Sequence, residues 1–400
     1  MSEIREIDIP VGATPQKISQ MLENFEDVHG ERMVVQMGPQ HPATHGVLRV
    51  ELETDGEMIM KATPHIGYLH RCFEKTCESM TWQQVVAYTD RLDYCSSANN
   101  NLGYVLACEK MFGIEVSERV QTIRVLVSEL NRLASHFIAI GTYGLDIGAW
   151  TPFLYLIQER EHILDLFDRL CGGRLLLNYM RIGGLTHDLP DNWLKEVHEY
   201  LSYMEGKLDE VNSLLSYNKI FVERLANVAI ISEDMCIKYG LTGPNLRGAG
   251  KKWDLRKNEP YCGYETYDFD IPVGDGEVGT IGDCWDRYIV RVKECEQSMR
   301  IIKQATERLE KMPGDDVLAA IPKSMTKVAP GEIYFRTEHP KGELGFYIVS
   351  NGKKFPWRLK CRAPSFSSLS VMSAVSPGLL IADMVALIGS IDIVLGEVDR

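Results

Sequence analysis

The chain lacks the closely spaced cysteine pairs that commonly bind iron–sulfur clusters and zinc. It has ten cysteines, but none stands in a CxxC pair, and Cys72 and Cys77 are five positions apart. Metal sites of these kinds commonly use such pairs, so we expect no metal held by this chain. The thiols are expected to be reduced, as in a cytosolic protein, because no export signal accompanies them.

Long apolar runs and an excess of positive charge are also missing. The most apolar stretch, residues 379–395, contains Asp383 and Asp392. A membrane-spanning helix needs about 20 mainly apolar residues, so we expect a buried helix in a soluble protein that can still dock on a membrane partner. The N-terminal sequence MSEIREIDIP has no apolar segment of a secretory signal. The net charge of −13 argues against sequence-independent binding of nucleic acid, which needs a basic face.

The chain is long enough to bury a large core, since it has 400 residues of which 45% are hydrophobic. Residues 1–30 are predicted as an N-terminal extension, in which Thr14 and Pro15 open a short helix. Residues 31–400 are predicted as one domain, because no internal repeat or low-complexity linker divides them. The predicted fold class is mainly α (α+β), a helical-bundle core with small flanking β-sheets.

Helical periodicity is clearest in four segments, which begin near Ser117, Pro152, Pro190 and Trp285. Apolar residues recur there at spacings of three and four, which favours long amphipathic helices packed as a bundle. The four apolar stripes are Ile123, Leu126, Leu130, Leu133 and Phe137; Leu156, Ile163, Leu166 and Leu170; Leu194, Val197, Leu201 and Leu208; and Ile289, Val292 and Met299.

Strand patterns flank these helices. Residues 31–63 and 330–360 alternate as half-buried strands do. Residues 240–283 are rich in Gly, Tyr and Asp and are predicted to be irregular.

The segment MGPQHPATHGVLR (37–49) joins two predicted strands and carries two histidines. Its prolines fix φ and remove amide donors, so the connection is predicted as a turn rather than sheet. Gly46 permits backbone angles that other residues avoid. A histidine on such a turn, His41 or His45, either caps backbone groups of a plain hairpin or presents its ring to a ligand.

Eight blocks of the sequence, in order along the chain, resemble a known family. They are MGPQHPATHGVLR (37–49), PHIGYLHRCFEK (64–75), TDRLDY (89–94), LNRLASH (130–136), NYMRIGG (178–184), GYETYDFD (263–270), RAPSF (362–366) and GEVDR (396–400). Together they are similar to the D-type subunit of the bacterial proton-pumping NADH-quinone oxidoreductase, the quinone-site subunit of respiratory complex I. The resemblance implies a fold like the large subunit of nickel–iron hydrogenases, without its metal site.

The resemblance also implies catalytic residues. Quinone reduction takes two electrons and two protons, and His and Tyr are suitable proton donors. The family's donors match His45 in THG and Tyr94 in RLDY. A third family position matches Asp146 in GLDIGA, whose carboxylate would favour the protonated form of the His45 ring. Taken alone, Tyr94 would be a core phenol bonded to a carbonyl, and Asp146 a helix-end residue.

Further residues are implied at the edge of the quinone pocket. Arg71 in LHRCFEK matches an arginine near the terminal four-iron four-sulfur cluster of the partner iron–sulfur subunit. A cation there would stabilise the reduced cluster. Arg91 is expected to support the same interface, and Val398 to line the quinone pocket. Taken alone, Arg71 would form a surface salt bridge.

One position departs from the family. Many relatives carry a histidine near the cluster two residues after the arginine of the block before NYMRIGG, where this chain has Leu176. An apolar side chain cannot take a proton when the cluster is reduced. We therefore expect the midpoint potential of the partner's cluster to depend less on pH than in relatives with the histidine, and a redox titration at several pH values checks this. A full proton-coupled slope would contradict it.

Three alternative functions find less support in the sequence. A hydrogenase large subunit would need two CxxC pairs, whereas near RLDY this chain offers only Cys95. A scaffold without catalysis would not need His45, Tyr94 and Asp146. A nucleotide enzyme would need a phosphate loop, but residues 243–252 lack the GxxxxGK[ST] spacing.

The sequence therefore predicts the quinone-binding subunit of a membrane-associated NADH:quinone oxidoreductase, peripheral on the cytoplasmic side of a bacterial inner membrane. Menaquinone or ubiquinone is the expected substrate, and electron transfer is coupled to proton translocation. The expected partners are the subunits lettered B, C, I and H in this family, of which B is the small iron–sulfur subunit and H a membrane subunit. The cluster is on the small iron–sulfur subunit, NAD binds elsewhere in the complex, and no nucleic acid is expected.

Overall fold

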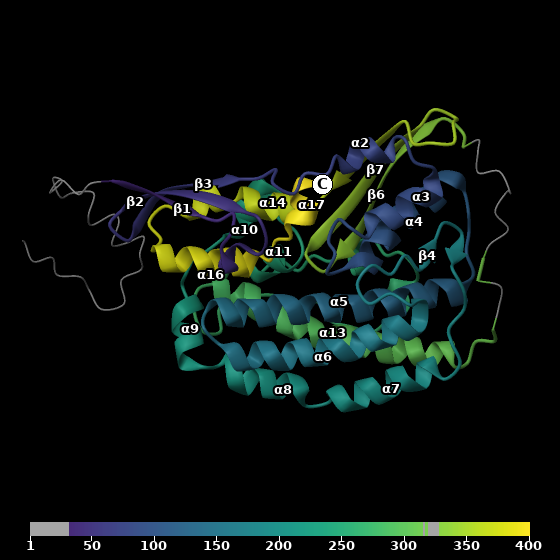
Figure 1. Ribbon diagram of the computed structural model, residues 1–400. Helices are drawn as coiled ribbons and strands as arrows, with labels where there is room; N and C mark the ends of the chain where they lie inside the picture. The colour runs from purple at the N-terminus through teal and green to yellow at the C-terminus, as the bar shows by residue number, and fades with distance from the viewer. Residues whose placement is uncertain (1–31, 315–316, 319–327) are drawn as a thin grey trace, which may run out of the picture.

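Long helices form the centre of the molecule (Figure 1). The computed structural model describes residues 32–314, 317–318 and 328–400. Helix α5 (Glu118–Asp146) packs against α4 (Ser97–Phe112), α6 (Trp150–Cys171), α13 (Cys284–Leu309) and α16 (Ile381–Ile391). The prediction of a mainly helical fold with small sheets is confirmed.

Helix α5 begins where the sequence predicts. The Ser117 side chain accepts a hydrogen bond from the Val120 amide and caps the helix. The five residues of its predicted apolar stripe are all buried. Polar residues of the same helix, among them Glu129, Arg132 and His136, are buried as well. The periodicity alone understates this burial, because α4, α6, α13 and α16 surround the helix.

Two other predicted helices have different bounds. Helix α6 begins at Trp150, so Pro152 lies within its first turn, where amide groups have no helical acceptor and proline is tolerated. The helix predicted from Pro190 through Leu208 is divided into α7 (Trp193–Met204) and α8 (Lys207–Val211). Gly206, at φ 83°, separates the two.

Two three-stranded antiparallel sheets flank the helices, as predicted. Strands β1 (Met33–Met37), β2 (Arg49–Asp55) and β3 (Met58–His65) lie in that order, and β2 pairs Val50 with Met37. Strands β6 (Gly331–His339), β7 (Gly342–Ser350) and β8 (Arg358–Arg362) form the second sheet. In Figure 1 the first sheet extends to one side of the bundle, and β6 and β7 rise on the other.

The remaining elements are short. They are η1 (Pro42–Thr44), α2 (Phe73–Cys77), α3 (Trp82–Thr89), β4 (Met180–Arg181), β5 (Gly184–Leu185), η2 (Asn212–Ser216), α9 (Lys219–Leu225), α10 (Glu233–Tyr239), α11 (Pro244–Gly248), α12 (Leu255–Asn258), η3 (Tyr264–Thr266), α14 (Pro364–Ser370), α15 (Met372–Val375) and α17 (Leu395–Asp399). Residues 240–283 thus contain three short helical turns within the segment predicted to be irregular.

Buried ion pairs join this irregular segment to the bundle. Arg247 donates hydrogen bonds to Glu294 Oε1 on α13 and Glu338 Oε1 on β6, both at 2.7 Å. Arg256 Nη1 lies 3.2 Å from both carboxylate oxygens of Glu129 on α5. Breaking one such pair would leave a buried charge unpaired, so these contacts constrain where the segment packs.

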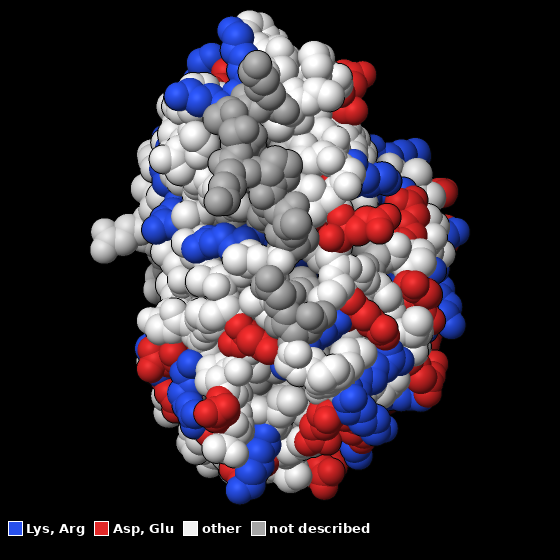
Figure 2. Space-filling model, turned by 90° about the vertical axis from the view of Figure 1, so that its right-hand side faces the viewer, with Lys and Arg blue, Asp and Glu red and all other residues white. Residues whose placement is uncertain are grey.

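The apolar stretch at residues 379–395 contains α16, in which Asp383 is buried. Within the described ranges, no helix combines the length and apolarity needed to cross a membrane. On the face shown in Figure 2, basic and acidic side chains are interspersed rather than gathered into one basic surface. The helix predicted at Thr14 and Pro15 lies outside the described residues, and the division at residue 31 stays a prediction.

Candidate functional site

The turn between β1 and β2 separates the roles of its two histidines. His41 Nδ1 accepts a hydrogen bond from the Ala43 amide at 3.2 Å and so caps η1. His45 ends η1 in the left-handed region, at φ 49°, which few non-glycine residues adopt. Gly46 follows at φ 127°, near Leu395 of α17. This backbone turns the His45 ring towards the bundle instead of towards its own turn.

His45 meets Asp146, which is 101 positions away in the sequence. Its Nε2 atom lies 2.5 Å from Asp146 Oδ2, and the two side chains are 13% and 6% exposed. Asp146 is the last residue of α5, where a carboxylate faces the negative end of the helix dipole. The structure therefore brings together two of the predicted catalytic residues.

Tyr94 faces the same place from the segment between α3 and α4. Within the described part of the chain its hydroxyl makes no hydrogen bond, so it is not a core phenol bonded to a carbonyl. Burial, together with nearby Cys95 and Asp93, raises the pKa of Tyr94 above its usual value. The phenol therefore stays protonated at neutral pH and is free to donate to a ligand.

A cavity of about 230 Å³ joins these residues. Its lining consists of Pro42, His45, Tyr94, Cys95, Ile138, Thr142, Leu145, Asp146, Lys341, Asp392, Ile393 and Val394. Complete small-molecule sites usually measure roughly 300–1,000 Å³. The cavity is thus sized for a compact ring, and an attached chain would have to leave through its opening.

Lys341 and Asp392 add a buried charged pair to the cavity. Lys341 Nζ lies 3.2 Å from Asp392 Oδ2 and 3.4 Å from Asp93 Oδ2. Burial alone would lower the pKa of Lys341, but the two carboxylates raise it above its usual value. The cavity therefore holds an ammonium group at neutral pH that the sequence prediction missed.

Arg71 lies just beyond the cavity. Its Nη2 atom donates to the carbonyl oxygens of Arg91 at 2.6 Å and Gly396 at 2.8 Å. In the described ranges Arg71 has no carboxylate partner, so it is not the surface salt bridge of the alternative interpretation. The Arg91 side chain is exposed and donates to the Ala87 carbonyl. Arg71 is thus a positioned cation whose charge remains available to a neighbour.

Two predicted positions lie elsewhere. Val398 is buried in α17 and does not line the cavity, whereas Val394, at the N-cap of the same helix, does. Leu176 is half-buried in the segment before β4. The C-terminal tail thus reaches the cavity through Val394, and the role of Val398 stays a prediction.

A group of potential ligand atoms lies behind the cavity. Asp93, His339 and Glu397 place one such atom each within 4.8 Å of the others. No spacing motif links positions so far apart, so this group carries no signal in the sequence. The absence of a metal in this chain stays a prediction.

Comparison with known proteins agrees with the motifs. The family model described as "Respiratory-chain NADH dehydrogenase, 49 Kd subunit" matches residues 146–400. The D-type NADH-quinone oxidoreductase subunit of Chlorobium luteolum is 51% identical over 376 residues, covering 94% of this chain and 95% of the relative. The D-type subunit of Pelodictyon phaeoclathratiforme is 49% identical over 402 residues, covering 99% and 100%.

A D-type subunit numbered 1, from Cytophaga hutchinsonii, is 50% identical over 377 residues, covering 92% of this chain and 95% of the relative. The matched family is related in fold to the large subunit of nickel–iron hydrogenases, in agreement with the helical core and small antiparallel sheets. Both the family model and the full-length relatives lead to the same assignment: this chain belongs to the D-type subunit family of NADH-quinone oxidoreductases.

Proposed function

We propose that this chain forms the quinone-reduction site of a membrane-associated NADH:quinone oxidoreductase that couples electron transfer to proton translocation. The observation that supports this most is the convergence of the His45–Asp146 pair and the unpartnered Tyr94 hydroxyl on one cavity. The cavity holds the quinone ring, and the isoprenoid tail extends through its opening towards the membrane.

His45 and Tyr94 each face one carbonyl oxygen of the quinone. Both can donate a hydrogen bond while the ring is oxidised and a proton as it is reduced. When His45 gives up its proton, Asp146 loses its cationic partner at 2.5 Å. That change in charge at the end of α5 couples quinone reduction to movements of the neighbouring subunits.

Electrons come from a four-iron four-sulfur cluster on the small iron–sulfur subunit, which supplies one-electron transfer next to the quinone. Arg71 faces that cluster. Its guanidinium group is held by two backbone carbonyls and has no carboxylate partner among the described residues, so its positive charge is available to the cluster. Arg91, exposed beside it, contacts the same interface.

The other assignments follow from the family. NADH is oxidised on another subunit, and the partners lettered C, I and H complete the contacts of this chain. The complex lies on the cytoplasmic face of a bacterial inner membrane, with this subunit peripheral. The substrate is menaquinone or ubiquinone.

A photoreactive short-chain quinone tests this proposal in the intact complex. The label is expected on peptides that contain residues 38–48 and 91–96, and excess unlabelled quinone should prevent it. A probe with the same chain but no quinone ring serves as the control. Labelling confined to other subunits, or labelling that unlabelled quinone does not reduce, would contradict the proposal.

A further inference from the structure

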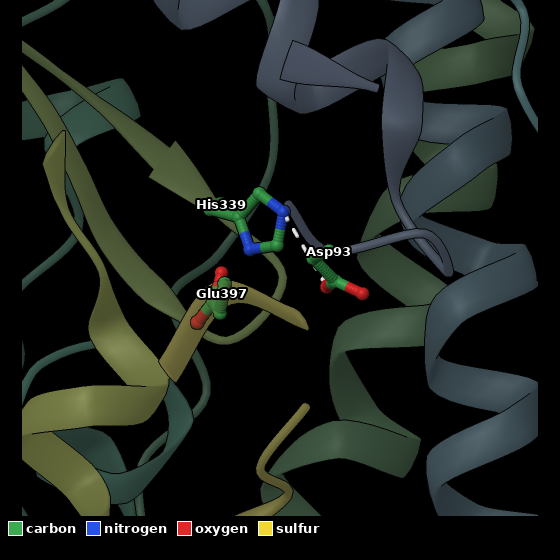
Figure 3. A group of neighbouring side chains, drawn as sticks. All are labelled: Asp93, His339 and Glu397. Atoms are coloured by element: carbon green, nitrogen blue, oxygen red, sulfur yellow. Dashed lines mark ion pairs between the residues drawn. The ribbon is translucent and has the colours of Figure 1, made fainter. Parts of the chain in front are cut away.

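Three buried side chains converge behind the quinone cavity (Figure 3). His339 comes from the end of β6, Glu397 from α17 and Asp93 from the segment before α4. Each is 0% exposed. His339 Nε2 lies 3.6 Å from Asp93 Oδ2, and one atom of each side chain lies within 4.8 Å of the other two.

Each of the three side chains has a polar atom without a hydrogen-bond partner in the described part of the chain. Asp93 Oδ2, His339 Nε2 and Glu397 Oε2 are unsatisfied within the described residues. The opposite oxygens are fixed, since Asp93 Oδ1 accepts from the Cys95 amide at 2.9 Å and Glu397 Oε1 from the Ser365 amide at 2.7 Å. Buried polar atoms are usually satisfied by protein or ordered water. The backbone thus holds one oxygen of each carboxylate and leaves the other free to accept from water or to carry a proton.

Lys341 connects this group to the cavity. Its Nζ atom lies 3.4 Å from Asp93 Oδ2, 3.2 Å from Asp392 Oδ2 and 3.3 Å from Ser135 Oγ. Lys341 itself lines the cavity with Tyr94. A fully buried ammonium so close to Asp93 also repels a further divalent cation, which favours a proton over a metal here.

The charges around Glu397 favour its neutral form. Burial and then the Asp93 carboxylate raise the pKa of Glu397 to about 7, while the Ser365 hydrogen bond and Lys341 oppose this rise. Burial, Lys341 and Arg132 lower the pKa of His339, so its ring is neutral. Near neutral pH the group therefore holds one proton that can leave.

We propose that Asp93, His339 and Glu397 form the proton store of the quinone site, in which Glu397 carries a proton that Asp93 and Lys341 pass to the cavity during quinone reduction. The inference rests on the proposed function. The quinone gains two electrons from the partner's cluster and two protons, one from His45 and one from Tyr94.

The store re-protonates Tyr94 after Tyr94 has given its proton to the quinone. The Tyr94 O–H bond breaks as a quinol O–H bond forms, and Lys341 returns a proton to the phenolate oxygen. The Glu397 O–H bond then breaks, and its proton, carried through Asp93 and bound water that the His339 ring orients, restores the ammonium. Glu397 is left as a carboxylate and takes a proton from bulk water before the next turnover.

Glu397→Gln in the assembled complex tests the store, because glutamine keeps the shape and can still accept from the Ser365 amide. Wild-type kcat should fall as pH rises through about 7, where Glu397 loses its proton. In the variant kcat should fall on the order of 10²-fold and lose this ionisation, while quinone binding stays unchanged. Redox-induced infrared difference spectra should also lose a protonated-carboxyl band.

Asp286→Asn is the matched control. Burial raises the pKa of Asp286 to about 6, but this residue does not line the cavity, so the control should keep the wild-type pH profile. Glu397→Asp, which retains an acid, should recover part of kcat and keep an ionisation.

The proposal of a proton store would be overturned if the Glu397→Gln variant kept the wild-type kcat. A lower kcat with an unchanged pH profile and infrared band would also overturn it. Failure of the wild-type complex to bind quinone in this cavity would instead overturn the proposed function.

Discussion

Replacing His45 with alanine is expected to lower kcat/KM for quinone on the order of 10²-fold. The ring lies 2.5 Å from Asp146 and lines the cavity, so its loss removes the proposed proton donor and leaves the Asp146 carboxylate without its imidazole partner. Quinone reductase activity of the intact complex, with assembly checked on a native gel, measures the effect.

His41→Ala provides a matched control from the same turn. His41 caps η1 by accepting from the Ala43 amide and does not line the cavity. Its loss should cost the turn about 1 kcal/mol and leave turnover nearly unchanged. Equal losses in both variants would mean that the turn as a whole matters and that His45 has no chemical role of its own.

The helices were predictable because their signals are local. The spacing of Ile123, Leu126 and Leu130, with Ser117 before them, specifies both the start and the buried face of α5. The burial of Arg132 and His136 was not predictable, because it depends on α13 and β6 packing around the helix. The break at Gly206 was missed since Leu208 keeps the apolar spacing across it.

The site was predictable only where a motif was contiguous. The resemblance pointed to His45, Tyr94 and Asp146, and the structure places all three at one cavity. Lys341 and Asp392 carry no local signal, because their pairing depends on the turn after β6 meeting the end of α16. The prediction named Val398 in the tail, whereas Val394, four residues earlier, lines the cavity, because the sequence does not show how far along the tail the cavity reaches.

Tyr94→Phe tests the central claim most directly. The Tyr94 hydroxyl has no hydrogen-bond partner among the described residues, so phenylalanine removes the proton donor without breaking a protein contact. A positioned proton donor contributes roughly 10²–10⁴-fold to a rate. We therefore predict that kcat for quinone reduction falls on the order of 10²-fold or more while the complex assembles normally.

Tyr104→Phe is the control for loss of a buried hydroxyl. Tyr104 donates to the Trp82 carbonyl at 3.0 Å and does not line the cavity, so its variant should lose about 1 kcal/mol of stability and keep its turnover. We predict a large loss of kcat in Tyr94→Phe alone. Full activity of an assembled Tyr94→Phe complex would contradict it and assign Tyr94 a structural role.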